Sequence, residues 1–417
     1  MTGSNPSAPS TVSEQARRRA ESAPAVALLV ALAALAPLSI DMFLPSMPTL
    51  AATFATDRGT LQLAVTLFIV AFAGSQLVYG PLSDRIGRRP VLLAGLALFV
   101  VGGLMSLAAP TVEVLLLGRV VQGLGGGAGP SLAHAIVLDV HGRERAGRVI
   151  AYMAIALPLA PAIAPIIGGF LQDSFGWHSV FVVLAGTGVL LAVAYRLVFP
   201  ETSPRRAEGA SARDLLADYR SLLSSPTYVA YALVMGLMFG GQLVFISSSS
   251  FVLIEEFGFS ARAFGLSFGF VALGIMGGAT VSSRLVDRWP QRRVVLLGAV
   301  VATGSSGVMA ALAAADMSNP VTVLAPMFGT AFGFGVSRPA ATAGALVPFQ
   351  HMAGLASGLL MFTQMVVAST YNIAYSNLVA VSAAGLAGGV FLSVVAGLLT
   401  VLVLRPGRGL EATATAP

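Results

Sequence analysis

Two opposite charges inside long apolar runs are the residues best placed to do chemistry. Asp41 lies nine residues before the end of its run at Leu50, and Arg119 lies seven residues after Val112. At about 1.5 Å per helical residue, both would lie at similar depth in a membrane. Ionisable groups at such depth are costly, so each is a functional candidate by default. An aspartate can take up a proton and an arginine cannot release one, so a pair or a shared water network would form a proton switch. A permanent ion pair that only fixes helix packing is the alternative.

A third charge and several polar side chains lie in later apolar runs. Arg338 precedes Pro339 near one end of its run. Its side chain could either extend to the membrane interface or face a cavity, and the sequence leaves both alternatives open. Amide and phenol groups in two other runs predict a mildly polar, aromatic substrate cavity, although each alone is more often a helix–helix hydrogen bond. These candidates are Gln242, Gln364, Tyr371, Asn372 and Tyr375.

The amino-acid composition argues against most classes of soluble protein and of metal-dependent protein. Hydrophobic residues make up 56% of the 417 residues and charged residues 10%, whereas soluble domains have about 25% charged residues. With no cysteine, neither a disulfide framework nor a thiolate metal site can form. The four histidines lack ligand spacing, so we expect no metal and no cofactor. The glycine-rich stretch 123–129 lacks the Lys-Ser/Thr of a phosphate loop, which favours close helix packing.

The elements that must position these groups are membrane-spanning helices, so the predicted fold is all-α and polytopic. Each span needs roughly 20 apolar residues, and the mean hydropathy is +0.84. Twelve candidate spans lie near 25–50, 60–80, 91–109, 112–136, 148–171, 179–199, 227–250, 262–283, 294–314, 320–345, 351–376 and 382–404.

The arginines predict the orientation of these spans. With both termini in the cytoplasm, 20 of the 24 arginines fall in cytoplasmic segments, which agrees with the positive-inside rule. Arg58 and Arg262 fall outside, and the other two are the arginines within spans described above. The net charge of +6 would suggest nucleic acid for a soluble protein, but here it comes from short loops between spans, so we expect no nucleic-acid partner.

The chain is predicted to divide into two sets of six spans. A polar tail (1–24) precedes the first set (25–199), and a linker (200–226) precedes the second set (227–404) and its tail (405–417). Within the linker, 212–223 is predicted to form an amphipathic helix. The stretch 285–292 repeats, in degraded form and at an offset of 203 residues, a charged stretch of the first set.

That charged stretch, 80–90, places four charges and two glycines between two apolar runs. Its order G-P-L-S-D-R-I-G-R-R resembles the loop between spans two and three of the major facilitator superfamily, whose pattern is G-x-L-[SA]-D-R-x-G-R-R. The resemblance implies two pseudo-symmetric six-helix halves around a cavity. It also implies a conformational role, in which the loop steadies the outward-open state, for Gly80, Asp84, Arg85, Gly87, Arg88 and Arg89.

Three further stretches resemble motifs of the same superfamily. Residues 41–48 resemble the D-M-Y-L-P-x-x-P signature of its Bcr/CflA drug-resistance branch, with Phe43 in place of Tyr. Arg119, Gln122 and Gly123 match the R-x-x-Q-G motif of span 4, whose arginine is implicated in proton coupling. Span 5 resembles the exporter motif G-P-x-x-G-G, with Ala164 in place of the first Gly. Its motif residues here are Pro161, Pro165, Gly168 and Gly169.

The resemblance implies a proton-coupled exporter of small, mostly apolar drugs in the bacterial plasma membrane, with Asp41 and Arg119 coupling protons. The expected partners are a drug, protons and the lipid bilayer, and we expect a monomer. An uptake symporter for a small nutrient is the first alternative, but it would show more polar cavity residues. A polytopic enzyme or sensor is the second. No cluster of acids, histidines or nucleophiles is present for an enzyme, and the tails are short for a sensor domain.

Overall fold

The computed structural model describes residues 22–156, 159–202, 212–404 and 406. Within these ranges the chain is helical and contains no strand, as expected. Most of the two predicted tails and residues 203–211 of the predicted linker lie outside the described residues.

The first group of helices runs from residue 23 to residue 198. It comprises α2 (Ala23–Asp41), η1 (Leu44–Ser46), α3 (Met47–Thr53), α4 (Arg58–Ile86), α5 (Arg88–Leu107), α6 (Val112–Gly126), α7 (Ala128–Ala156), α8 (Leu159–Phe175) and α9 (His178–Val198). We call it the N-terminal group.

A separate helix, α10 (Ala212–Leu223), precedes the second group and matches the predicted amphipathic helix in its bounds. The second group, called the C-terminal group, comprises α11 (Pro226–Ser250), η2 (Phe251–Glu256), α12 (Ala261–Leu285), α13 (Gln291–Ala314), α14 (Pro320–Leu346), η3 (Val347–Met352), α15 (Ala353–Leu378) and α16 (Ala383–Leu404).

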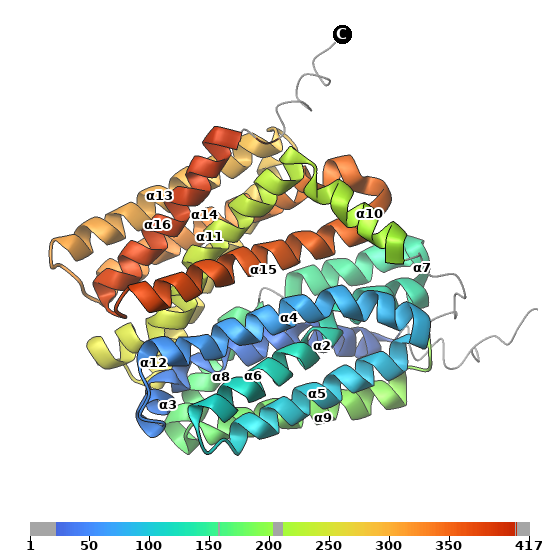
Figure 1. Ribbon diagram of the computed structural model, residues 1–417, viewed down its shortest axis with the longest axis horizontal. Coiled ribbons are helices and arrows are strands. Elements are labelled where there is room, and N and C mark those ends of the chain that lie inside the picture. Colours follow the sequence, from blue (N-terminus) through green and yellow to red (C-terminus); the bar gives the residue numbers. More distant parts are fainter. Residues whose placement is uncertain (1–21, 157–158, 203–211, 405, 407–417) are drawn as a thin grey trace, which may run out of the picture.

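The two groups pack side by side with their long helices running in similar directions (Figure 1). They meet along two helix pairs, α4 with α15 and α8 with α12. In Figure 1, α4 and α15 lie close at the left and diverge toward the right, where α7 and α10 are found. We call the end where α4, α12 and α14 begin the outer end, and the opposite end the inner end, because the arginine distribution predicts that the first faces outward.

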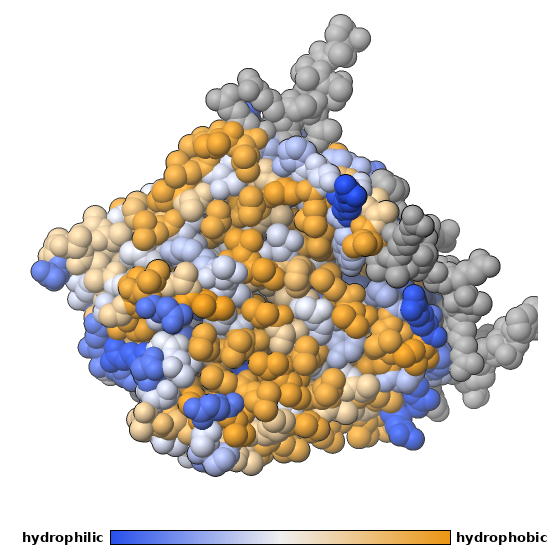
Figure 2. Space-filling model, in the orientation of Figure 1, coloured by the Kyte–Doolittle hydropathy of each residue, from blue (hydrophilic) through white to orange (hydrophobic). Residues whose placement is uncertain are grey.

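Side chains on the lipid-facing surface agree with a membrane location. Figure 2 shows a broad hydrophobic band across the middle of one face, with hydrophilic residues gathered at both ends. Leu190, Leu197 and Val403 are 66%, 73% and 75% exposed, which would be unfavourable for so many large apolar side chains in water. A bilayer covers such a band, so the protein is a multi-pass membrane protein.

Ten helical segments of the described chain are long and apolar enough to cross a membrane. They correspond to all the expected spans except the fourth and fifth. The fourth expected span is divided at Gly127 between α6 and α7. The fifth includes residues 157 and 158, which lie outside the described residues, and the described helices α6 and α8 are 15 and 17 residues long. The connection expected between these two spans lies inside the long helix α7. Twelve crossings therefore stay a prediction.

Local chemistry explains where several helices begin and end. Asp57, Ser225 and Ser260 each accept a hydrogen bond from the backbone N–H three residues later, which satisfies an amide that the helix leaves free. The Thr60 hydroxyl and amide lower the pKa of Asp57. Span 1 breaks after Asp41, because Pro45 and Pro48 lack the amides needed to continue α2 as one helix.

Candidate functional site

Arg119 lies at the centre of a buried network in the N-terminal group. Its side chain on α6 is fully buried. Nη1 donates to Ser39 Oγ at 3.0 Å and to Gln122 Oε1 at 2.8 Å, and Nε donates to the Ala64 carbonyl at 3.3 Å. The arginine thus ties α2, α4 and α6 together. Gln122, expected from the span 4 motif, is brought into the site as its direct partner.

Two aromatic rings face the same guanidinium. Its Cζ lies 4.7 Å from the centroid of Phe43 and 4.3 Å from that of Phe68. The electron-rich ring faces stabilise a cation that has been removed from water. Nη2 is buried and has no hydrogen-bond partner in the described part of the chain. The cation is therefore held firmly and keeps one donor group unused.

Asp41 lies close to this network in sequence but is not bonded to it. It is the last residue of α2 and only 4% exposed. Within the described residues its carboxylate has no hydrogen bond or ion pair, and Arg119 instead bonds to Ser39, two residues earlier. The direct Asp41–Arg119 pair that the sequence allowed is thus not formed in this state. What remains is a buried, unpartnered acid two residues after the serine that accepts from Arg119, whose own Nη2 is unused.

A second buried polar layer joins the two helix groups. Gln62 Nε2 donates to Ser248 Oγ at 2.9 Å, and Asn372 Nδ2 donates to Thr66 Oγ1 at 2.9 Å. The Ser247 hydroxyl completes the layer by donating to Asn372 Oδ1 at 3.0 Å. All five side chains are at most 3% exposed. Of these five residues only Asn372 was predicted from the sequence, and the run of four serines at 247–250 in an apolar span was the available signal for two others.

The remaining cavity candidates have different surroundings. Gln242 and Gln364 are buried on α11 and α15, and each has one amide atom without a partner among the described residues. Tyr375 is 4% exposed. Tyr371 donates to the Gly389 carbonyl at 2.6 Å and so joins α15 to α16. Arg338 is exposed on α14 and has no described side-chain partner, so it does not join the buried layer.

The charged hairpin forms its contacts within the N-terminal group. Arg88 pairs with Asp84 at 2.6 Å and with Asp139 on α7 at 3.1 Å. Arg89 donates to the Arg196 carbonyl at the end of α9. Arg85 is exposed, and Gly80 has open space around it. These bonds link the end of α4, the start of α5, the middle of α7 and the end of α9.

Glu201 completes this hairpin and was missed from the sequence. Its carboxylate accepts the backbone N–H groups of Arg88 and Arg89 at 2.9 and 3.1 Å. An anion there satisfies the free amides and the positive end of the α5 dipole. Gly87 has a φ of +111°, and a Cβ there would collide with the Glu201 carboxylate. The backbone conformation therefore requires the glycine of the motif, and a side chain in its place would displace the capping carboxylate.

The span 5 motif lies where the two helix groups touch. A Cβ on Gly168 would collide with the Met42 carbonyl, and a Cβ on Gly169 would collide with the Ala261 carbonyl of α12. Pro165, inside α8, lies against Gly265 of α12 through its carbonyl. Pro161 lies in the first turn of the same helix. Small residues here allow backbones of different groups to come into direct contact.

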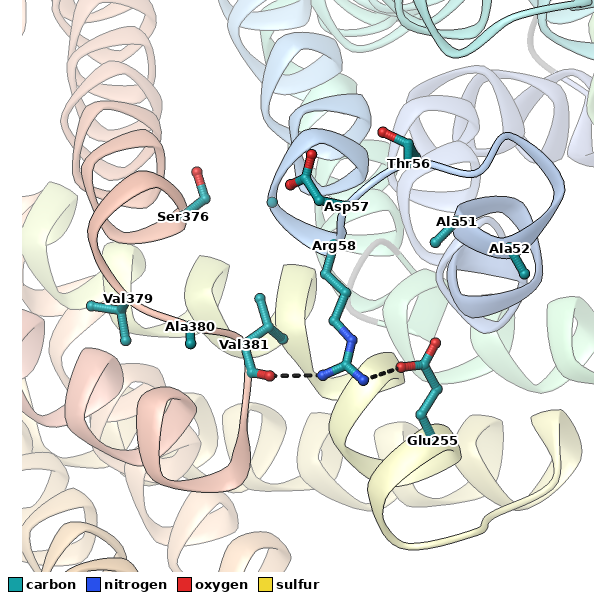
Figure 3. A pocket seen from close by; sticks show the side chains of 11 residues that line it. Ala51, Ala52, Thr56, Asp57, Arg58, Glu255, Ser376, Val379, Ala380 and Val381 are labelled. Atoms are coloured by element: carbon teal, nitrogen blue, oxygen red, sulfur yellow. Dashed lines mark hydrogen bonds and ion pairs between the residues drawn. The ribbon is translucent and has the colours of Figure 1, made fainter.

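A cavity of about 600 Å³ opens between the groups at the outer end. Arg58 of α4 crosses it toward Glu255 of η2 and the Val381 carbonyl (Figure 3). Ser376 lines its other side. No group of His, Cys, Asp or Glu side chains in the described chain could hold a metal ion.

Comparisons with known proteins place the chain among transporters. Residues 29–372 match the family described as the Major Facilitator Superfamily. A chloramphenicol resistance protein of Pseudomonas aeruginosa is 31% identical over 322 residues, which cover 77% of this chain and 76% of the relative. The multidrug resistance protein MdtL of Klebsiella pneumoniae is 27% identical and covers 91% of this chain and 95% of its own.

A solved structure confirms the architecture. The crystal structure of a D-xylose-proton symporter superposes with a TM-score of 0.74 at 16% identity, covering 92% of this chain and 97% of the symporter. At that identity the likeness concerns the fold alone. The expected fold, two groups of spanning helices in the arrangement of this superfamily, is confirmed.

Proposed function

Because this chain belongs to the major facilitator superfamily, and is thus a membrane transporter and not an enzyme, we propose that it exports small drugs in exchange for protons. The relatives named for chloramphenicol and multidrug resistance support a drug as the cargo. The proposed location is the bacterial plasma membrane, with both termini in the cytoplasm and a monomer as the working unit. The arginine distribution supports this orientation.

The buried acid of Asp41 is the observation that carries the proposal. Uphill export needs an energy source, and the sequence has no nucleotide-binding motif. Asp41 is 4% exposed and unpartnered within the described residues. A lone charge there is costly, so this carboxyl group is suited to exchange a proton when its surroundings change. A sodium ion would instead need several oxygen ligands.

The Arg119 network gives the exchange a direction. The guanidinium keeps its charge throughout, and Nη2 has no partner in the described chain. When Asp41 loses its proton, the cation proposed to attract it is Arg119, which is already bonded to Ser39 two residues earlier. Proton release would then pull Asp41 toward Arg119, and drug binding would favour this deprotonated state, so that drug and proton exclude each other. Each ligand would thus bias the equilibrium between the two transport states.

The other motif residues have supporting roles in this proposal. The two sets of spans, 25–199 and 227–404, rock against each other around the predicted substrate cavity between them. The hairpin from Gly80 to Arg89 sets the balance between conformations. The span 5 motif forms a contact surface between the two sets of spans. Gln242, Gln364 and Tyr375 offer polar groups to the cargo, whereas Tyr371 positions α16.

Drug-driven proton movement in liposomes tests the coupling role. The purified chain is reconstituted with a pH-sensitive dye, and chloramphenicol and a panel of other neutral drugs are added. The Asp41→Asn variant keeps shape and hydrogen bonding but cannot titrate, so it is expected to bind drug and to lose drug-induced proton release and uphill export. Asp316→Asn is the matched control, because Asp316 is exposed and asparagine tolerates its positive φ of 55°.

The outcome that contradicts this role is uphill export by Asp41→Asn at the wild-type rate. The same liposomes separate export from the alternative, uptake of a small nutrient. An exporter moves drug in the direction opposite to the proton flow, whereas a symporter would move its cargo in the same direction as the protons.

A further inference from the structure

Arg58 and Arg262 are the two arginines predicted to lie on the outer side, against the positive-inside rule. They occupy matching positions, the first residue of α4 and the second residue of α12. They are 204 residues apart, close to the 203-residue offset of the repeated charged stretch. Pseudo-symmetric arginines on the unfavoured side of the membrane suggest a shared task.

Each arginine reaches from its own helix group into the other. Arg58 Nη2 lies 2.5 Å from Glu255 Oε2, and Nη1 donates to the Val381 carbonyl at 2.8 Å (Figure 3). Glu255 belongs to η2, a π-helical turn that extends α11, while its neighbour Glu256 accepts the Ala383 amide at the start of α16. One acid of this turn thus stays within the C-terminal group and the other crosses the interface.

Arg262 makes the opposite crossing, from α12 to the end of α8. Its Nε lies 3.6 Å from Asp173 Oδ2, and its backbone N–H donates to the same oxygen at 3.2 Å. Nη2 donates to Ser174 Oγ at 2.9 Å, and the guanidinium lies 5.0 Å from the centroid of Phe170. The two contacts therefore close the outer end at both helix pairs that join the groups.

The polar layer already described lies beneath the first of these contacts. Residues 58, 62 and 66 follow each other at four-residue intervals, so they share one face of α4. Gln62 and Thr66 lie about one and two turns deeper than Arg58. At the inner end the contacts described above for the charged hairpin join no residue of the C-terminal group. Ties between the groups thus gather at the outer end.

From this geometry we infer that Arg58–Glu255 and Arg262–Asp173 are a symmetric pair of outer clamps that hold the transporter closed to the outside and must open in every transport cycle. The inference concerns the alternating access assumed by the proposed function, and it holds for any cargo. The paired side chains are 42% and 31% exposed in one clamp and 55% and 28% in the other. Such pairs are weak, which suits contacts that break and re-form repeatedly.

Distances between spin labels test the clamps without any drug. The chain has no cysteine, so labelled cysteines can be introduced directly. An outer pair at Thr53 and Asn377 and an inner pair at Ile86 and Val347 each connect the two groups at exposed positions. In lipid nanodiscs, Glu255→Gln is expected to raise the population with a long outer distance about two- to five-fold, with a matching rise in short inner distances.

Two controls make the result specific. Glu113→Gln removes an acid that is exposed near the outer end of α6, and it should leave both distributions unchanged. The charge swap Arg58→Glu with Glu255→Arg should restore the closed outer population that either single change loses. Unchanged outer distances in Glu255→Gln, or a swap no better than the single variants, would overturn the inference. Partial unfolding is recognised because both pairs would broaden together, and Asp173→Asn then provides the independent second clamp variant.

Discussion

At the scale of single residues, burial changes what the same side chain can do. Arg58 and Arg119 both make contacts at α4, the first as a residue of that helix and the second through the Ala64 carbonyl. Arg58 is partly exposed and paired with Glu255, so its contact is weak and reversible. Arg119 is fully buried with three hydrogen-bonded neighbours and two rings. Its contacts are stronger because water does not compete for them.

Arg119→Lys tests whether the charge alone is sufficient. A lysine keeps the positive charge but cannot reach Ser39, Ala64 and Gln122 at once or stack as a plane on two rings. Each lost hydrogen bond to a charged group costs about 1.5–3 kcal/mol, so we expect drug-driven proton release to fall by about ten-fold or more. Liposome flux measures it, with Arg293→Lys, at an exposed position on α13, as the control. Normal flux in Arg119→Lys would mean that charge alone is enough.

At the scale of helices, ends and breaks carry most of the specific chemistry. The proton candidate Asp41 is at the broken end of α2, and the clamp residues are at the starts of α4 and α12. Glu201 caps the start of α5 from a segment more than a hundred residues away. Such ends expose backbone groups that need partners, so they are where distant segments become joined.

Glu201→Ala tests the importance of the α5 cap. Removing the carboxylate leaves two amides without their acceptor, and loss of a cap costs about 0.5–2 kcal/mol. We expect a lower unfolding temperature and faster hydrogen exchange at the first turn of α5. Glu201→Gln keeps an acceptor oxygen and should lie between the alanine variant and the wild type. Equal exchange in all three proteins would show that the cap contributes nothing measurable.

At the scale of the whole molecule, the arginine distribution predicts how the chain is oriented in the membrane. A reporter active only in the cytoplasm, fused after positions near Arg89, Arg213 or Arg292, is expected to give signal. Fusions near Arg58 or Arg262 are expected to give none, because those positions lie at the outer end. Signal from this second set would contradict the proposed topology. Expression of every fusion is checked by immunoblot.

The sequence by itself determined the properties that depend on neighbours along the chain. The apolar runs predicted most helices to within a few residues, and 212–223 was predicted with the bounds of α10, because a helix in a bilayer satisfies its hydrogen bonds locally. The family followed from short motifs such as Asp84 to Arg89. Spans 4 and 5 were less well predicted, since the glycine-rich stretch does not mark where α6 ends and the polar connection does not interrupt α7.

Only the tertiary structure decided which polar groups meet. Asp41 and Arg119 were correctly placed at buried positions, but depth along a helix does not specify rotation about it, and Arg119 bonds to Ser39 instead. The polar layer of Gln62, Ser248 and Asn372, and the outer clamps, join residues 89 to 306 positions apart. Such contacts depend on how the two helix groups dock. The free energy of docking is spread over many interfacial contacts, and no local sequence pattern encodes them.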